Sequence, residues 1–508
     1  MSDIKNVIVQ AGGRGSRMEY QTANKPKCLI SIYGKPLLYH LSDVFKGCKF
    51  FIITGYKADV LKAYMKTFPP EFEYELIKEN EKGTCDGLQT AIDAIPNKSK
   101  FALVWSDLYF SSKLNLPKTN ANFIGISNKL MCRWRISNGR LVNEVGRKNG
   151  VIGLFIFRKP KELPLIPNSG EFVRFIAESD IKLKKFLVRG VSEIGTLNAF
   201  NEIKRNESHS RFFNSIKFHK NSVVKTIKNK DYAYLLENEI NWYKFVKKAG
   251  YTNIPTIFRF KPLSMELLKG ASPHKYKNLN QSEKESVLNK IFGALESLHD
   301  LSYAPYDITP TKEVYVKKTW ERIRRVAPLI PSAETPEYFV NGKVVRNLLN
   351  PKNRRLLTTA FNRLRHDGKF TIIHGDPTFS NIILSRDLNM VSLIDPRGYF
   401  GKLKLYGDPL YDYAKLYYSV VGNYDAFNER LFELHVNGIN VTLTIQSNNW
   451  ESLEKVFYLK FKDRLKEIKI LHAFIWLSLA GYVIDDVDSM LGAYFRGLEL
   501  LEEALKNG

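Results

Sequence analysis

Short apolar runs near the start of the chain predict buried strands that lead into polar or glycine-rich turns. Residues 6–10 (NVIVQ) are mostly β-branched, and a turn with several glycines follows at once. Residues 101–110 (FALVWSDLYF) form a longer apolar run that contains Asp107. Such strands are typical of an α/β sheet, where backbone N–H groups just beyond a strand can bind an anion.

The pattern changes beyond about residue 206. Residues 222–228 (SVVKTIK) alternate between apolar and polar positions, which predicts a half-buried strand that carries Lys225. Residues 231–250 then place apolar side chains at helical spacing, with Glu239 near that face. Further on, residues 371–384 (TIIHGDPTFSNIIL) predict a strand, a polar loop and a second strand, and another apolar strand ends at Asp395. The two parts of the chain therefore differ in architecture.

Length and composition fit a globular protein of two or three domains, with 508 residues, 44% of them hydrophobic and 25% charged. The longest apolar stretch near the C-terminus, residues 473–483, is shorter than the roughly 20 residues of a membrane span and predicts a core helix. The first residues run directly into a predicted strand without a signal peptide, so we expect a cytoplasmic location and no transmembrane segment. The cysteines lack metal-ligand spacing and are expected to be reduced, mostly structural thiols: Cys28, Cys48, Cys85 and Cys132.

A net charge of +25 raises the question of nucleic-acid binding. The lysines are spread along the whole chain, and no recognisable nucleic-acid module accompanies them. We therefore expect small-molecule substrates, no nucleic-acid partner, and a basic surface that favours anionic nucleotides. A homo-oligomer and a weak association with acidic membrane surfaces are both compatible with the sequence.

The turn after the first strand has residue types suited to a triphosphate. Glycines let the backbone approach phosphate oxygens, Ser16 can donate a hydrogen bond, and Arg17 supplies a fixed positive fork. Together with the PK and GKP elements at residues 26–27 and 34–36, this turn resembles the opening of the sugar-phosphate nucleotidyltransferase family. The resemblance implies a Rossmann-like domain over residues 1–205, a mixed sheet flanked by helices, with Arg17 and Lys27 as catalytic cations. It also implies a nucleotide cradle of Ala11, Gly12, Gly13, Gly15 and Ser16.

Three later segments extend the resemblance. The segment KGTCDGL looks like the family's base and ribose loop, which makes Lys82, Gly83 and Thr84 nucleotide-binding candidates. Asp107 and Glu193 match the family's magnesium ligands, and few hard oxygen ligands are what Mg²⁺ needs when substrate phosphates also hold it. The alternative interpretations are a helix cap for Asp107 and an ordinary surface residue for Glu193. The proline usual after the arginine is absent from residues 18–25, which puts the shape of that loop in doubt.

The later motifs contain the parts of a phosphoryl-transfer site. An aspartate base, an asparagine five residues on and a second aspartate after a hairpin are present as Asp376, Asn381 and Asp395. The HGD and IDPRG motifs resemble the aminoglycoside phosphotransferase and choline kinase family. The resemblance implies a bilobal, kinase-like α+β domain with an N-lobe over 206–270 and a largely helical C-lobe over 271–508. It assigns Mg²⁺ to Asn381 and Asp395, and ATP contacts to Lys225, Glu239 and Glu266.

Other residues around these motifs have two interpretations. His374 would brace the catalytic loop, while Asp408 and Asp412 are equally well explained as structural caps or catalytic aspartates. The segment 206–218, where a glycine-rich ATP lid is expected, contains no glycine. The positive charge of Arg397 would be unfavourable beside a quaternary ammonium, so this residue suits a polyol, sugar or acidic acceptor better. Aromatic residues from Tyr399 to Tyr418 are either core or a box for a cation.

The preferred hypothesis is a bifunctional enzyme. The second domain would phosphorylate a small alcohol, amino alcohol or sugar with ATP, and the first would transfer a nucleotide to that phosphate, with CTP the first choice, UTP the second and Mg²⁺ in both sites. Such pairs feed surface-glycan, capsule or head-group decoration in related families. One alternative is an anomeric sugar kinase coupled to a uridylyl- or guanylyltransferase. The other is a nucleotidyltransferase with a non-catalytic, kinase-like binding module.

Overall fold

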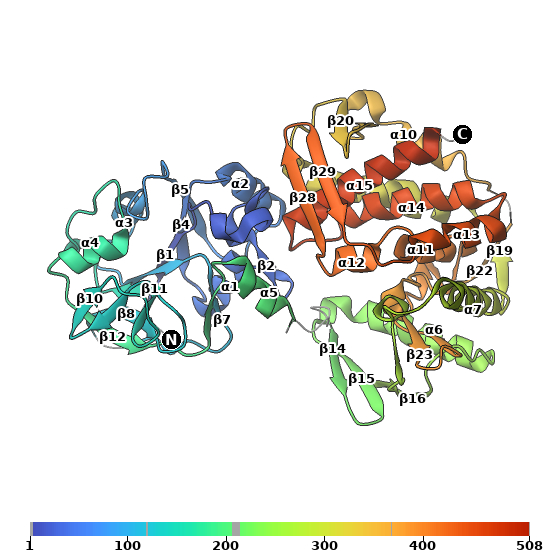
Figure 1. Ribbon diagram of the computed structural model, residues 1–508, viewed down its shortest axis with the longest axis horizontal. Coiled ribbons are helices and arrows are strands. Elements are labelled where there is room, and N and C mark those ends of the chain that lie inside the picture. Colours follow the sequence, from blue (N-terminus) through green and yellow to red (C-terminus); the bar gives the residue numbers. More distant parts are fainter. Residues whose placement is uncertain (1–3, 118–119, 206–213, 367, 507–508) are drawn as a thin grey trace. The chain divides into compact units, whose positions relative to one another are not determined.

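The computed structural model describes residues 4–117, 120–205, 214–366 and 368–506 (Figure 1). Its contacts divide the chain into two compact units. Unit 1 comprises residues 1–208 together with the short segment 484–488, and unit 2 comprises residues 209–483 and 489–508. Within the described ranges, no helix is both long enough and apolar enough to cross a bilayer.

Unit 1 is built on a mixed sheet with the strand order β10-β9-β11-β6-β1-β4-β5, and β8 joins β12 to β11. The pairs β1–β4, β1–β6, β4–β5 and β8–β12 are parallel, and β11 runs antiparallel to both β6 and β8. The strands of this sheet are β1 (Asn6–Gln10), β4 (Lys49–Thr54), β5 (Tyr74–Lys78), β6 (Phe101–Trp105), β8 (Asn122–Ser127), β9 (Arg135–Ser137), β10 (Arg140–Val142), β11 (Gly150–Phe157) and β12 (Leu183–Leu187). The expected mixed sheet is therefore observed.

Helices and two small ribbons complete unit 1. One apolar cluster joins the sheet to α3 and α4, and a second joins α1 and α5 to the loops after β1. The ribbons pair β2 with β3 and β7 with β13. The elements are α1 (Leu37–Val44), α2 (Ala58–Thr67), α3 (Leu88–Asp93), α4 (Phe172–Glu178), α5 (Leu197–Arg205), β2 (Ser31–Ile32), β3 (Lys35–Pro36), β7 (Leu108–Phe110) and β13 (Val191–Glu193).

Unit 2 begins with an antiparallel sheet of order β14-β15-β17-β16, and α6 packs against β15. The helix begins after a short turn and buries Leu236, Ile240 and Tyr243 along one face, as the helical spacing predicts. The elements are β14 (Asn214–Phe218), β15 (Ser222–Ile227), β16 (Ile257–Phe260), β17 (Leu263–Glu266) and α6 (Ala233–Lys248). The glycine-free segment 206–218 is described only from residue 214 onward.

The rest of unit 2 combines helices with small sheets. Helix α14 is apolar on nearly all sides and packs between α9 and α11. Residues 473–480 are part of α14, which confirms the expected core helix for that stretch. The helices are α7 (Gln281–His299), α8 (Ile308–Lys312), α9 (Lys318–Val326), α10 (Leu356–Phe361), α11 (Pro409–Val420), α12 (Tyr424–Asn428), α13 (Glu454–Phe461), α14 (Leu465–Ala480) and α15 (Val487–Lys506).

The strands of this region form four small sheets. The sheets have the orders β18-β23-β24, β19-β22-β27, β25-β26 and β21-β20-β29-β28, and the sequence did not indicate the last of these. The strands are β18 (Gly270–Ala271), β19 (Tyr303–Pro305), β20 (Glu337–Val340), β21 (Lys343–Arg346), β22 (Lys369–Ile372), β23 (Ile382–Ser385), β24 (Val391–Leu393), β25 (Tyr399–Phe400), β26 (Leu403–Lys404), β27 (Tyr406–Gly407), β28 (Phe432–Asn437) and β29 (Asn440–Ile445).

Candidate active sites

The glycine turn of unit 1 follows β1 directly, as the sequence predicts. The carbonyl of Gly12 accepts a hydrogen bond from the N–H of Tyr56 at 2.9 Å, which fixes the turn against the loop after β4. Gly15 has a φ of 63° and begins the helical turn that carries Ser16 and Arg17. A Cβ at Gly13 would meet nothing within 4 Å, so this part of the turn is open to a ligand. The turn therefore retains exposed backbone and polar groups suited to phosphates.

Four charged side chains from separate segments converge beyond this turn. Lys27 Nζ lies 2.5 Å from the carboxylate of Asp107, and Asp107 is in the turn between β6 and β7. The N–H of Ile194 donates to the Asp107 carbonyl at 2.8 Å, which brings Glu193 alongside. A Cβ at Gly195 would lie 2.9 Å from Glu193 Oε1, 3.3 Å from an Arg17 guanidinium nitrogen and 3.7 Å from Asp107 Oδ2. The fold thus brings together Arg17, Lys27, Asp107 and Glu193.

The electrostatics of this cluster suit a cation held between two carboxylates. Burial and the nearby Asp107 raise the pKa of Glu193, while Lys27 and Arg17 oppose that rise. The Oδ1 atom of Asp107 is buried and has no hydrogen-bond partner in the described structure. No group of three or more His, Cys, Asp or Glu side chains in the described ranges could hold a metal. The donor set therefore fits Mg²⁺ only if substrate phosphates complete its coordination.

The candidate base and ribose loop is held mainly by contacts within the protein. The Thr84 hydroxyl accepts the Phe172 N–H at 2.8 Å, and the Thr84 carbonyl accepts a hydrogen bond from the Gln10 side chain at 2.5 Å. Gly83 has a φ of 107°, and a Cβ there would lie 2.5 Å from the Gly170 carbonyl. Lys82 is exposed. Thr84 and Gly83 thus fix the loop's shape beside β1, and Lys82 is the side chain free to reach a ligand.

Sequence reasoning missed Glu79, which follows β5 and lies against the glycine turn. A Cβ at Gly12 would come within 1.9 Å of Glu79 Oε1, and one at Gly55 within 2.5 Å. Burial, with Asp86 and Glu81 nearby, raises the pKa of Glu79 to about 7. Gly12 therefore makes room for a carboxyl group as well as for phosphates. No local pattern marked this residue, because its role depends on two strands that are not adjacent in sequence.

The structure gives Lys25 a different environment from Lys27. Lys25 is buried within unit 1, where its ammonium lies 3.1 Å from Asp486 and also contacts Asp488. Burial lowers the pKa of Lys25, but the two carboxylates outweigh it and raise the pKa above its ordinary value. The Lys25 ammonium therefore forms a structural ion pair with these two carboxylates.

In unit 2, a buried lysine links the small antiparallel sheet to the IDPRG motif. Lys225 Nζ on β15 lies 2.6 Å from Glu239 on α6 and 3.0 Å from Asp395 Oδ1. Asp395 follows β24 and has a φ of 54°. The expected lysine–glutamate pair is therefore formed, and Asp395 lies beside it. This arrangement is suited to hold ATP phosphates together with a divalent cation.

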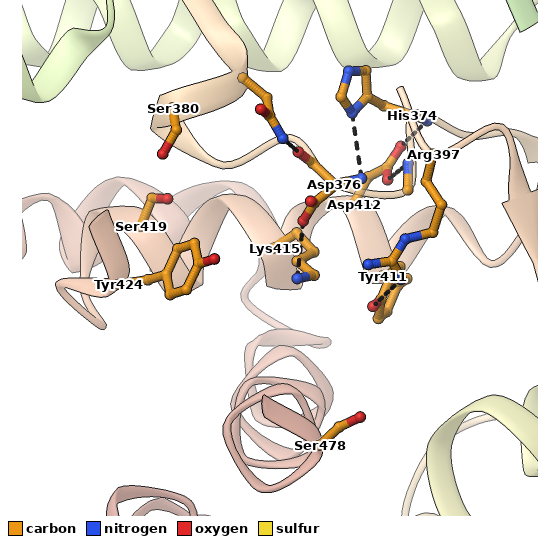
Figure 2. Close-up of polar contacts among 12 residues, drawn as sticks. His374, Asp376, Ser380, Arg397, Tyr411, Asp412, Lys415, Ser419, Tyr424 and Ser478 are labelled. Atoms are coloured by element: carbon orange, nitrogen blue, oxygen red, sulfur yellow. Dashed lines mark hydrogen bonds and ion pairs between the residues drawn. The ribbon is translucent and has the colours of Figure 1, made fainter. Parts of the chain in front are cut away.

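The catalytic loop after β22 is fixed by a network of hydrogen bonds (Figure 2). The buried His374 side chain contacts the Ile394 carbonyl at 2.9 Å through Nε2, and its Nδ1 accepts the N–H of Asp376 at 3.3 Å. Because a carbonyl only accepts, Nε2 carries the proton and the ring is neutral; burial lowers the pKa of His374 accordingly. The Asn381 amide donates to the Asp376 carbonyl at 2.8 Å. His374 thus braces the loop as expected.

The two downstream aspartates have structural contacts. Asp412 on α11 is fully buried and accepts the N–H groups of His374 and Gly375 at 2.8 and 2.7 Å. It also contacts His299 Nε2 at 3.1 Å. Asp408 caps α11 by accepting the Leu410 N–H at 2.9 Å. Of the two interpretations left open by the sequence, these contacts favour the structural one.

The carboxylate of Asp376 has a cationic partner that sequence reasoning missed. Lys415 Nζ on α11 lies 2.9 Å from Asp376 Oδ1, and Figure 2 shows the two side chains facing each other. The ion pair places a positive charge beside the candidate base. No local spacing in the sequence connects Lys415, which lies in the helical segment after Asp412, with Asp376.

Glu266, the third residue expected to contact ATP, ends β17. Its carboxylate accepts hydrogen bonds from the backbone N–H and the hydroxyl of Thr256, at 3.3 and 2.9 Å. The side chain is therefore occupied by the neighbouring β16 region.

Comparison with known proteins identifies both units. Residues 7–117 match the family described as MobA-like NTP transferase domain, and residues 201–436 match the family described as phosphotransferase enzyme family. The chain is 28% identical over 167 residues to the bifunctional protein GlmU of Methanococcus maripaludis, which covers 32% of this chain and 38% of that protein. It is 41% identical over 64 residues to glucose-1-phosphate cytidylyltransferase of Salmonella typhimurium, which covers 12% of this chain and 25% of the relative. The chain thus spans well under half the length of these curated relatives.

Solved structures resemble the first unit. The crystal structure of HddC from Yersinia pseudotuberculosis aligns with a TM-score of 0.33 at 21% identity, covering 40% of this chain and all of that one. CTP:phosphocholine cytidylyltransferase from Streptococcus pneumoniae aligns with a TM-score of 0.31 at 20% identity over 40% of this chain and all of that one. On the two family matches, this chain is a fusion of a MobA-like NTP transferase domain with a domain of the phosphotransferase enzyme family.

Proposed function

We propose that the chain is a two-step activating enzyme. The second domain transfers the γ-phosphoryl group of ATP to a small hydroxyl compound, and the first domain transfers a nucleotidyl group from a nucleoside triphosphate to the resulting phosphate. The observation that carries the proposal is that one chain assembles two separate charged clusters, Lys27–Asp107 in unit 1 and Lys225–Glu239 in unit 2. Each has the charges that its reaction requires.

In the kinase step, Asp376 is the base. Its carboxylate receives the acceptor's proton as the acceptor oxygen bonds to the γ-phosphorus, and the bond from that phosphorus to the bridging oxygen breaks to release ADP. Lys225 orients the ATP phosphates, and Glu239 holds Lys225 in place. Asn381 and Asp395 would hold Mg²⁺, which supplies positive charge for the phosphates.

In the nucleotidyl step, no protein nucleophile is needed. A phosphate oxygen of the phosphorylated acceptor bonds to the α-phosphorus, and the bond to the pyrophosphate oxygen breaks. Arg17 and Lys27 stabilise the charge on the departing pyrophosphate. Asp107 and Glu193 would hold Mg²⁺ that neutralises the phosphates.

The nucleotide is assigned to CTP first and UTP second. The glucose-1-phosphate cytidylyltransferase from Salmonella typhimurium is 41% identical to this chain over 64 residues, which supports a cytidylyl donor. The product would be a nucleotide-activated small molecule, ready for transfer onto a surface glycan, capsule or lipid head group. Because ATP and CTP are cytoplasmic metabolites, we place both reactions in the cytoplasm.

Site variants of the full chain test the proposal. Wild type is incubated with ATP, one nucleoside triphosphate at a time and a small-molecule extract of the cells that make the protein, and new diphosphate conjugates are identified by mass. We expect a CTP-dependent conjugate, its loss in Asp376→Asn, and accumulation of the phosphorylated acceptor in Asp107→Asn. A conjugate formed equally by Asp376→Asn would show that the kinase-like domain only binds. A conjugate formed with UTP or GTP alone would exclude the cytidylyl assignment.

A further inference from the structure

The site around Asp376 contains an unusual concentration of positive charge. Lys415 lies at 2.9 Å from Asp376. Arg397 follows the metal-binding aspartate, and a Cβ at Gly375 of the catalytic loop would lie 2.9 Å from Arg397 Cβ. Lys318 and Arg322 are one helical turn apart on α9, which packs against α14, as does α11, the helix that carries Lys415. The charges of Arg397, Arg322, Lys415 and Asp376 all act on Lys318. Figure 2 shows Asp376, Lys415 and Arg397 gathered beside one another.

Two of these cations have neutral hydrogen-bond partners: Arg322 donates to the Ser478 hydroxyl at 2.8 Å and to its carbonyl at 3.1 Å, and Arg397 donates to the Tyr411 hydroxyl at 3.3 Å. Asp376 is paired with Lys415, and no other described carboxylate lies within ion-pairing distance of Lys318, Arg322 or Arg397. Burial, together with the like charges of Arg397, Arg322 and Lys415, lowers the pKa of Lys318 well below its ordinary value. Cations that lack a carboxylate partner in a half-buried site are unfavourable unless a ligand supplies negative charge.

Aromatic rings in this region already have the protein's own cations near their faces. The Arg322 guanidinium lies 5.0 Å from the centre of the Tyr482 ring, and the Arg397 guanidinium 5.8 Å from that of Tyr399. Lys415 Nζ lies 5.2 Å from the centre of the Tyr418 ring. A box for a quaternary ammonium needs open ring faces and little competing positive charge. The site therefore disfavours choline-like acceptors.

The cations of this cluster differ from the residues assigned to the ATP phosphates. Those phosphates are assigned to Lys225 and Asp395, where the positive charge of Lys225 is already shared by two carboxylates. Asp376 is among the charges that act on Lys318. Because Asp376 receives the proton of the acceptor hydroxyl, positive charge gathered around it acts on the acceptor.

We propose that the acceptor of the kinase step is an alcohol that also carries a negatively charged group, a carboxylate or a phosphate, bound by Lys318, Arg322 and Arg397. The proposal rests on the proposed kinase function. The anionic group anchors the acceptor while its hydroxyl oxygen bonds to the γ-phosphorus, its proton passes to Asp376, and ADP leaves. This excludes simple amino alcohols and neutral polyols as the preferred substrates.

Charge fractionation of an acceptor pool tests the proposal with the full chain. A small-molecule extract of the producing cells is separated by ion exchange into anionic, neutral and cationic fractions. Each fraction is incubated with ATP labelled in the γ-phosphoryl group, and Asp376→Asn is the blank. We expect labelled product from the anionic fraction only. Product from the neutral or cationic fraction overturns the anionic acceptor, whereas no product from any fraction overturns the kinase function itself.

A phosphatase treatment separates the two sources of negative charge. Treatment of the anionic fraction with alkaline phosphatase before the assay abolishes acceptor activity if the anchor is a phosphate monoester, and leaves it intact if the anchor is a carboxylate. Lys318→Met and Arg322→Met should each raise the KM for the active fraction about 10- to 100-fold without changing the KM for ATP. Lys466→Met, an exposed lysine on α14, is the matched control and should change neither. Unchanged acceptor KM in both site variants would contradict the binding role.

Discussion

Replacing Glu79 by glutamine should make unit 1 more stable at alkaline pH and leave it nearly unchanged at acidic pH. Folding raises the pKa of Glu79 from 4.5 to about 7, through burial and the neighbouring Asp86 and Glu81. Between pH 4.5 and pH 7, the folded state therefore holds a proton that the unfolded state has lost. The stability that this proton contributes is fully present below pH 4.5 and is lost as the pH rises through 7. A shift of this size corresponds to at most about 3 kcal/mol, and partial solvent exposure reduces it to about 1–2 kcal/mol.

Thermal unfolding of wild type and Glu79→Gln between pH 5 and pH 8.5 measures this difference. We expect the two melting curves to coincide near pH 5, and the variant to melt a few degrees higher at pH 8.5. An ionised Glu79 beside Gly12 also repels a triphosphate, so the KM for the nucleotidyl donor should rise with pH more steeply in wild type. Glu71→Gln, an exposed glutamate just before β5 that does not act on Glu79, is the control and should follow wild type. Parallel pH profiles for wild type and Glu79→Gln would refute the reasoning.

Three further substitutions test other contacts. Lys225→Met should lower kcat/KM for ATP by at least about 100-fold while leaving pyrophosphate release with a supplied phosphorylated acceptor unchanged, and loss of both activities would contradict separate sites. Asp412→Ala leaves the buried N–H groups of His374 and Gly375 unpaired and should cost about 3 kcal/mol of unfolding free energy, measured by denaturant titration, whereas a cost below about 1 kcal/mol would contradict the bracing role. Lys27→Met should slow pyrophosphate release about 100-fold with ADP formation unaffected, and an unaffected pyrophosphate rate would remove Lys27 from the site.

Local pattern was enough to predict the elements that carry the candidate sites. The β-branched run before the glycine turn became β1, and the alternation around Lys225 became β15. Helical spacing placed Glu239 on the face of α6 that turns toward Lys225, and the two are 2.6 Å apart. In these cases the chemistry lies at the end of an element whose periodicity is visible in the sequence.

Contacts between distant segments were not predictable in this way. The partners of Lys25 lie 461 and 463 residues later in the chain, so no spacing rule connects them. The pairing of Lys415 with Asp376 depends on how α11 packs under the catalytic loop. The four-stranded sheet that includes β20 and β29 joins strands about a hundred residues apart. Alternation of apolar and polar residues can predict a strand, but it does not predict which strand it pairs with. Long-range packing, not local propensity, decided each of these contacts.

The most direct test of the two-step account follows one phosphorus atom through both reactions. The full chain is incubated with ATP labelled with ¹⁸O in its γ-phosphoryl group, unlabelled CTP and the acceptor fraction, and the conjugate is fragmented in a mass spectrometer. The account predicts that the phosphate next to the acceptor carries the ¹⁸O label and that the phosphate next to the cytidine does not. A conjugate without label in either phosphate would contradict it, because the phosphate used by the first domain would then not come from the second.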